Sequence, residues 1–206
     1  MSEPIPETPA TPDTAATPET AAAPAGAASA AAPAPASASG PAPGRWTLDE
    51  GSSAIGFQHK TFWGLANVRG TFSGLHGDGE IGADGTAHGT VQVDAASLDT
   101  KHAKRDTHLR SADFFDAGQH PQITYTATSV TRGADGTVQV TGDLAVRGTS
   151  RPVNFTATTP ELTADAVTLA AEVVVDRAWY GMTWNQLGML RGAATLSLTL
   201  RFTHTG

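Results

Sequence analysis

The sequence contains no cysteine among its 206 residues. This absence excludes disulfide bonds, thiolate catalysis, cysteine-ligated metal sites and a lipid-modified N-terminal cysteine, although it does not identify a compartment. The chain also lacks any run of about 18 consecutive apolar residues, the length that a membrane-spanning helix needs. Its first residues, MSEPIPETPATPD, contain neither the basic nor the apolar segment of a signal peptide. We therefore expect a cytosolic location, or an extracytoplasmic one if the start is misassigned.

The first 44 residues lack aromatic and basic residues altogether and contain 10 of the 13 prolines and 16 alanines. Such a segment buries too little apolar surface to offset the entropy lost on ordering. We therefore predict a disordered tail over 1–44 and one globular domain over 45–206, which carries all 13 aromatic residues. With 16 acidic and 13 basic residues, this domain is not expected to bind nucleic acid.

From Arg45 onward, apolar and polar residues alternate with a period of two, which is typical of strands with one buried face. Asp-Gly pairs at 84–85 and 135–136 lie between alternating runs and predict hairpins. A meander of this kind closes most economically as a barrel, because closure removes exposed strand edges. The expected strands lie at 46–49, 53–60, 66–74, 78–83, 87–96, 122–131, 137–146, 152–159, 166–176 and 193–203.

One segment, between Asp99 and Pro121, does not alternate. Its apolar residues Ala103 and Leu109 and the pair Phe114–Phe115 fit helical turns. We predict a helix near 101–110, with Asp99 or Thr100 as its N-cap, and a second turn near 111–117.

Several segments of the domain carry a resemblance to known proteins, namely HAKRDTHLRSADFFD at 102–116, GDLAVRGTSRPVNF at 142–155, DRAWYGM at 176–182, WTLD at 46–49 and VRGTF at 68–72. The first three are similar to signature segments of the YceI-like family of lipocalin-like, polyisoprenoid-binding proteins, and the last two resemble its opening strands. The resemblance covers 45–204. It implies an all-β fold, an extended eight-stranded antiparallel lipocalin-like β-barrel with a short helical segment near 101–117. It also implies a non-catalytic protein whose lumen holds a polyisoprenoid, a prenylated quinone or a fatty amide.

A set of aromatic, apolar and polar residues is expected to bind this ligand. The aromatic residues in the non-alternating stretches FWGLAN and WYGMTW are expected to border the pocket mouth, because rings in loops often do so. His59 and Arg69 match the family's polar positions, and either of them or His108 could hydrogen-bond the polar head. The full set is Phe57, His59, Phe62, Trp63, Arg69, Phe72, His108, Leu109, Phe114, Trp179, Tyr180, Met182 and Trp184. No catalytic residue, metal or cofactor other than a bound lipid or quinone is expected.

The polar residues allow other interpretations. Arg105, Asp106 and His108 could form a hydrogen-bonded network that holds the helix over the barrel. A metal site is disfavoured, because His102 and Asp106 share a helix face but His108 lies about 200° around the helix from Asp106, so the three side chains cannot converge. An enzyme that acts on an isoprenoid-type lipid, with His59, Asp106 and His108 as acid–base groups, is the alternative function.

Two further partners are left open besides the hydrophobic small molecule. The basic run at 101–110 could make transient contact with an anionic membrane surface, and the resemblance allows a homodimer. The Pro/Ala-rich tail could instead tether the barrel to another protein.

Overall fold

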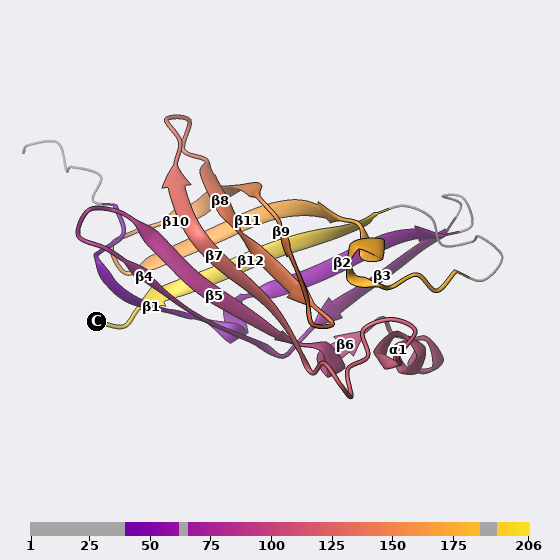
Figure 1. Ribbon diagram of the computed structural model, residues 1–206. Helices are drawn as coiled ribbons and strands as arrows, with labels where there is room; N and C mark the ends of the chain where they lie inside the picture. The colour runs from indigo at the N-terminus through magenta and orange to yellow at the C-terminus, as the bar shows by residue number, and fades with distance from the viewer. Residues whose placement is uncertain (1–39, 62–65, 186–192) are drawn as a thin grey trace, which may run out of the picture. The chain divides into compact units, whose positions relative to one another are not determined.

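The computed structural model describes residues 40–61, 66–185 and 193–206 (Figure 1). Residues 1–39, almost all of the predicted disordered tail, lie outside the described residues. The first described residues already contact the barrel, because the Ala42 N–H donates to the Ala164 carbonyl at 3.0 Å.

The described chain forms twelve strands, which pair only in antiparallel fashion. They are β1 (Gly44–Leu48), β2 (Ala54–Thr61), β3 (Ala66–Phe72), β4 (Leu75–Ile81), β5 (Ala87–Asp94), β6 (Leu98–Asp99), β7 (Gln122–Arg132), β8 (Val138–Val146), β9 (Thr149–Pro152), β10 (Phe155–Leu162), β11 (Ala166–Val175) and β12 (Ala194–His204). The helical elements are η1 (Glu50–Ser52), η3 (Ala95–Ser97), α1 (Ala103–Arg110) and η4 (Arg177–Tyr180).

Eight of these strands close into a barrel. The order is β1-β4-β5-β7-β8-β10-β11-β12, and β1 completes the circle by pairing with β12. The wall changes partners along β12: Phe202–His204 pair with β1, whereas Thr195–Thr199 pair with β2. The strands β2, β3 and β6 therefore continue the wall at one end of the barrel. The predicted eight-stranded antiparallel barrel with one short helix is confirmed.

The alternation seen in the sequence becomes the inner and outer faces of this wall. On β8, Val138, Val140, Leu144 and Val146 are buried and the residues between them are mostly exposed. Both predicted Asp-Gly hairpins are present, with Gly85 and Gly136 in the left-handed region. Glycine adopts this conformation without the steric cost that a side chain would bring.

The helix differs from the prediction at its start. The N-cap of α1 is His102, whose Nδ1 accepts a hydrogen bond from the Arg105 N–H at 3.3 Å. Asp99 is not available as a cap, because its carboxylate accepts from the backbone N–H and the ammonium of Lys101. Lys101 also has a φ of 61°, so the helix cannot begin there.

Other strand boundaries differ where elements are short. The strands β6 and β9 were not predicted, because two and four residues are too few to show alternation. The strand expected at 152–159 begins at Phe155, since the preceding Thr149–Pro152 segment pairs back on β8 as β9.

The two ends of the barrel are different. In Figure 1, α1 and the η4 turn lie at one end, whereas the β4–β5 hairpin and the C-terminus lie at the other. We call these the proximal and the distal end. No helix within the described ranges is long and apolar enough to cross a membrane. The cytosolic location stays a prediction.

Candidate functional site

The proximal half of the lumen contains a cavity of about 390 Å³. An engineered apolar cavity of about 150 Å³ is sufficient to hold benzene, so this space accommodates a much larger apolar group. Its wall is made of inward-facing residues of β2, β3, β5, β7, β8, β10, β11 and β12, and α1 and η4 contribute residues at the open end. Apart from a few polar side chains, the lining is aliphatic and aromatic.

Most of the predicted ligand-binding residues lie around this cavity. Nine of them line it, namely Phe57, His59, Phe72, His108, Leu109, Phe114, Tyr180, Met182 and Trp184. Phe62 and Trp63 lie outside the described residues. Three aromatic rings form a cluster at the mouth. The centroid of the His108 ring, on α1, lies 4.6 Å from that of Trp184 and 5.1 Å from that of Phe114.

Two predicted residues do not line the cavity. Arg69 follows the inward-facing Val68 on β3, so its side chain is on the outer face, where Nε donates to Gln58 Oε1 at 2.8 Å. Trp179 is 51% exposed, because the single turn of η4 places Tyr180 inward and Trp179 outward. Neither residue is in position to contact a molecule in this cavity.

Four side chains with basic nitrogen atoms line the cavity, and no described carboxylate does. They are His59, Arg105, His108 and Arg177. Arg105 is held by Thr100, whose Oγ1 accepts from Nε at 2.7 Å and whose carbonyl accepts from Nη2 at 2.8 Å. His108 pairs with Asp113 outside the cavity, at 3.0 Å between Nε2 and Oδ2. The mouth is therefore rich in hydrogen-bond donors and favours a ligand group with acceptor oxygens.

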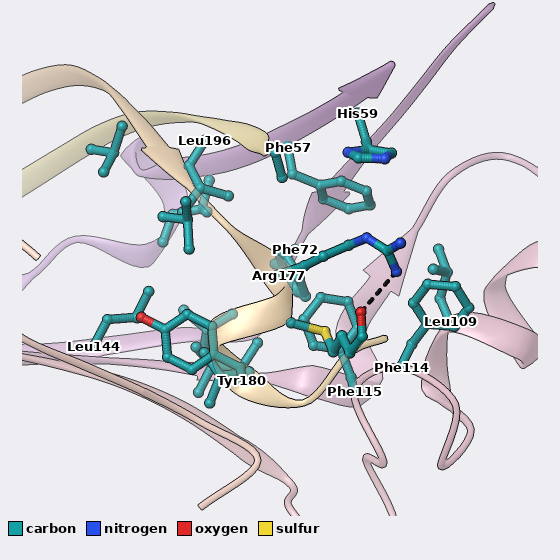
Figure 2. Close-up of a pocket in the computed structure, with 18 of the residues that line it drawn as sticks. Phe57, His59, Phe72, Leu109, Phe114, Phe115, Leu144, Arg177, Tyr180 and Leu196 are labelled. Carbon is teal, nitrogen blue, oxygen red and sulfur yellow. Dashed lines mark hydrogen bonds between the residues drawn. The ribbon is translucent and has the colours of Figure 1, made fainter. Parts of the chain in front are cut away.

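Arg177 connects the mouth loop to the cavity. Its Nη1 donates to the carbonyls of Met182 at 2.8 Å and Trp184 at 2.9 Å. Figure 2 shows its side chain between His59 on one side and Phe114 and Phe115 on the other. Burial lowers the pKa of this guanidinium, and the nearby Asp176 carboxylate opposes the shift.

His59 is buried, with 9% of its surface exposed, and neither ring nitrogen has a hydrogen-bond partner among the described residues. Burial lowers its pKa below the usual 6.5, and the positive charge of Arg177 lowers it further. The Ala193 backbone opposes this shift, although it does not reach hydrogen-bond geometry with either ring nitrogen. The neutral imidazole that results can donate one hydrogen bond and accept another.

This lowered pKa makes the stability depend on pH. Because the unfolded chain binds a proton at His59 more readily than the native barrel, the free energy of unfolding should fall as the pH drops below about 6.5. The slope from this residue is at most about 1.4 kcal/mol per pH unit. Urea unfolding of the wild type and His59→Phe over this pH range should show a flatter dependence in the variant. Equal slopes would contradict the prediction.

Of the aromatic residues that the structure describes, Tyr180 is the most buried, with 1% of its surface exposed. Its hydroxyl has no hydrogen-bond partner among the described residues, and burial raises its pKa. An unpaired buried hydroxyl costs about 1–3 kcal/mol. We expect Tyr180→Phe to raise the free energy of unfolding of the lipid-free protein by about 1 kcal/mol. A loss of stability in urea unfolding would show that the hydroxyl has a partner in solution.

Comparison with known proteins agrees with this architecture. The YceI-like domain model matches residues 46–202. The chain belongs to the YceI-like family. A UPF0312 protein of Vibrio parahaemolyticus is 38% identical over 96 residues, which is 46% of this chain and 51% of that protein. Protein YceI of Escherichia coli is 46% identical over 67 residues, 32% of this chain and 35% of that protein. These matches span about half the length of the relatives, or less.

Solved structures share the fold of this YceI-like barrel. BcnA of Burkholderia cenocepacia superposes with a TM-score of 0.67 at 16% identity, over 75% of this chain and 98% of BcnA. A polyisoprenoid binding domain from Saccharophagus degradans, implicated in plant cell wall breakdown, gives 0.63 at 18% identity, over 78% and 98% of the two chains. At these identities the likeness establishes the fold.

The YceI-like barrel does not assemble the acid–base set of the enzymatic alternative. Asp106 does not line the cavity, because its Oδ1 accepts hydrogen bonds from both the backbone N–H and the hydroxyl of Thr100. This carboxylate holds α1 in place, as the structural interpretation of the Arg105–Asp106–His108 cluster expected, although His108 pairs elsewhere. Within the described ranges, no three His, Asp or Glu side chains gather as a metal site would require.

Sequence reasoning missed Arg105 and Arg177 as lining residues. The sequence analysis places Arg105 in a network over the barrel and does not include Arg177 among the expected ligand-binding residues. Arg105 lies in a short helix and Arg177 in a single turn, and the sequence around them does not indicate whether their side chains face the lumen. The missed apolar lining had a signal, because inward positions such as Leu196, Leu198 and Leu200 lie on the alternating face of β12.

Proposed function

We propose that this YceI-like protein binds one long-chain amphiphilic lipid without transforming it, and sequesters or carries it. The observation that supports this most is the composition of the proximal cavity, which is apolar along the barrel and basic only toward its mouth. A molecule that matches it has a long hydrocarbon chain and one polar group with acceptor oxygens. A polyisoprenoid, a prenylated quinone and a fatty amide all have this form.

The hydrocarbon chain would supply most of the affinity. Each methylene removed from water contributes about 0.8 kcal/mol, so a chain of about twenty carbons gains roughly 16 kcal/mol before losses. Association entropy and the ordering of a flexible chain offset much of this gain, which leaves micromolar to nanomolar dissociation constants. Met182, with its flexible thioether, adapts to chains of different shape at the mouth.

The polar head would lie beside His59, Arg105 and Arg177. Their donors suit a hydroxyl, quinone or amide oxygen, and the two guanidinium groups also suit an anionic head. The structural neighbour from Saccharophagus degradans is named for polyisoprenoid binding, which supports a chain of this class here. Homodimer formation and membrane contact stay predictions.

Native mass spectrometry of the protein, purified from its own host without detergent, tests the proposal. We expect one prenyl or acyl species per chain, unchanged in covalent structure, which organic extraction releases and identifies. An empty protein that also fails to take up long-chain isoprenoids, quinones and fatty acids would overturn the proposal. A bound lipid that is chemically altered over time would instead favour the enzymatic alternative.

A further inference from the structure

The distal half of the barrel contains a second cavity, of about 400 Å³, that the proposed head-and-chain site does not use. Its walls include Trp46 on β1, Ala127 on β7, Val138 on β8 and Leu169 on β11. These residues face inward, so the cavity is a continuation of the lumen. We call the two cavities the proximal and distal chambers.

The two chambers share four lining residues, Val91, Tyr125, Phe155 and Leu200. These residues come from β5, β7, β10 and β12, which are spaced around the barrel wall. The ring centroids of Tyr125 and Phe155 are 5.6 Å apart. We call these four residues the waist, because they lie where the two chambers meet and line both of them.

The Tyr125 ring at the waist is fixed. Its hydroxyl donates to the Val153 carbonyl at 2.8 Å, and it passes Gly142, where an added Cβ would lie 2.8 Å from the hydroxyl oxygen. Burial, with the nearby charge of Asp143, raises the pKa of this hydroxyl to about 12, so it remains a donor at neutral pH. The hydrogen bond therefore holds one side of the waist in place.

Beyond the waist, small residues form part of the wall of the distal chamber. Gly79 on β4, Gly89 on β5 and Ala127 on β7 are consecutive register partners across the sheet, and all three line this chamber. The two glycines bring no side chain to this part of the wall, and Ala127 brings only a methyl group. These small residues leave space in the distal chamber, and its mainly apolar inner wall suits a hydrocarbon chain.

The charged groups of the distal chamber lie at its edge and have both signs. Asp78, Glu80, His88 and Arg132 are all exposed there. The proximal mouth, by contrast, combines two guanidinium groups with two imidazoles and no described carboxylate. An acidic or acceptor head is therefore better matched at the proximal mouth, and the chain end points toward the waist.

We propose that the Tyr125–Phe155 waist selects ligands by chain length. Short chains are held in the proximal chamber alone, and longer chains pass through the waist so that their ends lie in the distal chamber near Trp46. Along β12, the lining residues from Ala194 to Phe202 span about 27 Å at 3.4 Å per residue. This inference rests on the proposed lipid binding and adds the chain length that the site selects.

Fatty acids that carry bromine on the terminal carbon test the position of the chain end, because bromine quenches a nearby indole. Two full-length reporters are needed: one keeps only Trp46, with the other three tryptophans changed to Phe, and one keeps only Trp184. We expect a chain of about twelve carbons with bromine at its end to leave Trp46 unquenched, and the same acid with bromine beside its carboxyl group to quench Trp184 at the mouth. A chain of about twenty-two carbons should quench Trp46.

Variants of each chamber complete the test. Ala127→Phe, which fills only the distal chamber, should abolish quenching of Trp46 and leave binding of the shortest acid unchanged. It should weaken binding of the longest acid about tenfold or more, since each buried methylene is worth nearly fourfold in affinity. If the waist acts as a barrier, the affinity of the wild type should change abruptly at the chain length that reaches it. Phe155→Ala, which widens the waist, should make affinity vary smoothly with chain length.

The outcomes separate this inference from the proposed function. If all chain lengths bind but Trp46 is never quenched, or the shortest chain quenches it equally, the selection by the waist is wrong and lipid binding stands. If Ala127→Phe weakens short and long chains alike, the two chambers are not arranged in series. If no acid binds the wild type at any length, lipid binding and the inference both fail.

Discussion

Replacing Leu198 with tryptophan is expected to lower the affinity for long-chain lipids on the order of a hundredfold. Leu198 faces the proximal chamber from β12 and packs against the buried core residues around it. The empty space beside it can accept the larger ring, so the barrel should still fold. The indole would displace about four methylenes of the ligand, which is worth about 3 kcal/mol.

The neighbouring position offers a matched control. Thr199 lies next to Leu198 on β12 but is exposed on the outer face. Thr199→Trp increases the side-chain volume on the same strand by more than Leu198→Trp does, but the new indole lies outside the lumen. Displacement of a bound fluorescent fatty acid should show near wild-type affinity for Thr199→Trp and a large loss for Leu198→Trp. Equal affinities in the two variants would place the ligand outside the barrel.

Removing the Asp106 carboxylate is expected to cost about 3 kcal/mol of the free energy of unfolding. Asp106 is 7% exposed, and its Oδ1 accepts from the Thr100 backbone N–H at 3.0 Å and from the Thr100 hydroxyl. Hydrogen bonds to a charged acceptor contribute about 1.5–3 kcal/mol each. In Asp106→Ala both Thr100 donors are left buried without that partner.

Urea unfolding measures this loss and can separate it from a general effect of charge. Asp106→Asn keeps an oxygen that can accept both hydrogen bonds, so it should be less destabilising than Asp106→Ala. Asp113→Ala removes an exposed carboxylate at the same end of the barrel and should change stability by less than about 1 kcal/mol. If Asp106→Ala is no more damaging than Asp113→Ala, the Thr100–Asp106 contact does not hold α1.

Alternation and turn chemistry were sufficient to predict the wall of the barrel. On β12, the period of two assigns Leu196, Leu198 and Leu200 to one face, and the structure places all three around the proximal chamber. The hairpins at Asp84 and Asp135 follow from local hydrogen bonds, because each carboxylate accepts from the backbone N–H two residues later, at 3.0 Å. Such signals lie within a few neighbouring residues and can be read without the fold.

Polar residues of the site were harder to assign. The structure places His59 and His108 at the cavity, whereas Arg69 faces outward and Arg177, which was not expected to bind the ligand, reaches the lumen. For Arg69, the alternation of β3 after Val68 already favours the outer face, against its match to a polar position of the family. An arginine in a turn carries no periodic signal, and the direction of Arg177 depends on partners such as the Met182 carbonyl.

The sequence by itself therefore determined the class of fold, the family, the strand faces and some of the apolar residues of the proximal chamber. Only the tertiary structure decided which basic groups meet at the mouth, and that the lumen has two chambers joined at Tyr125 and Phe155. The reason is geometric. A pattern along one strand fixes which side chains share a face, whereas the space left inside a barrel depends on what strands from the whole domain place opposite one another.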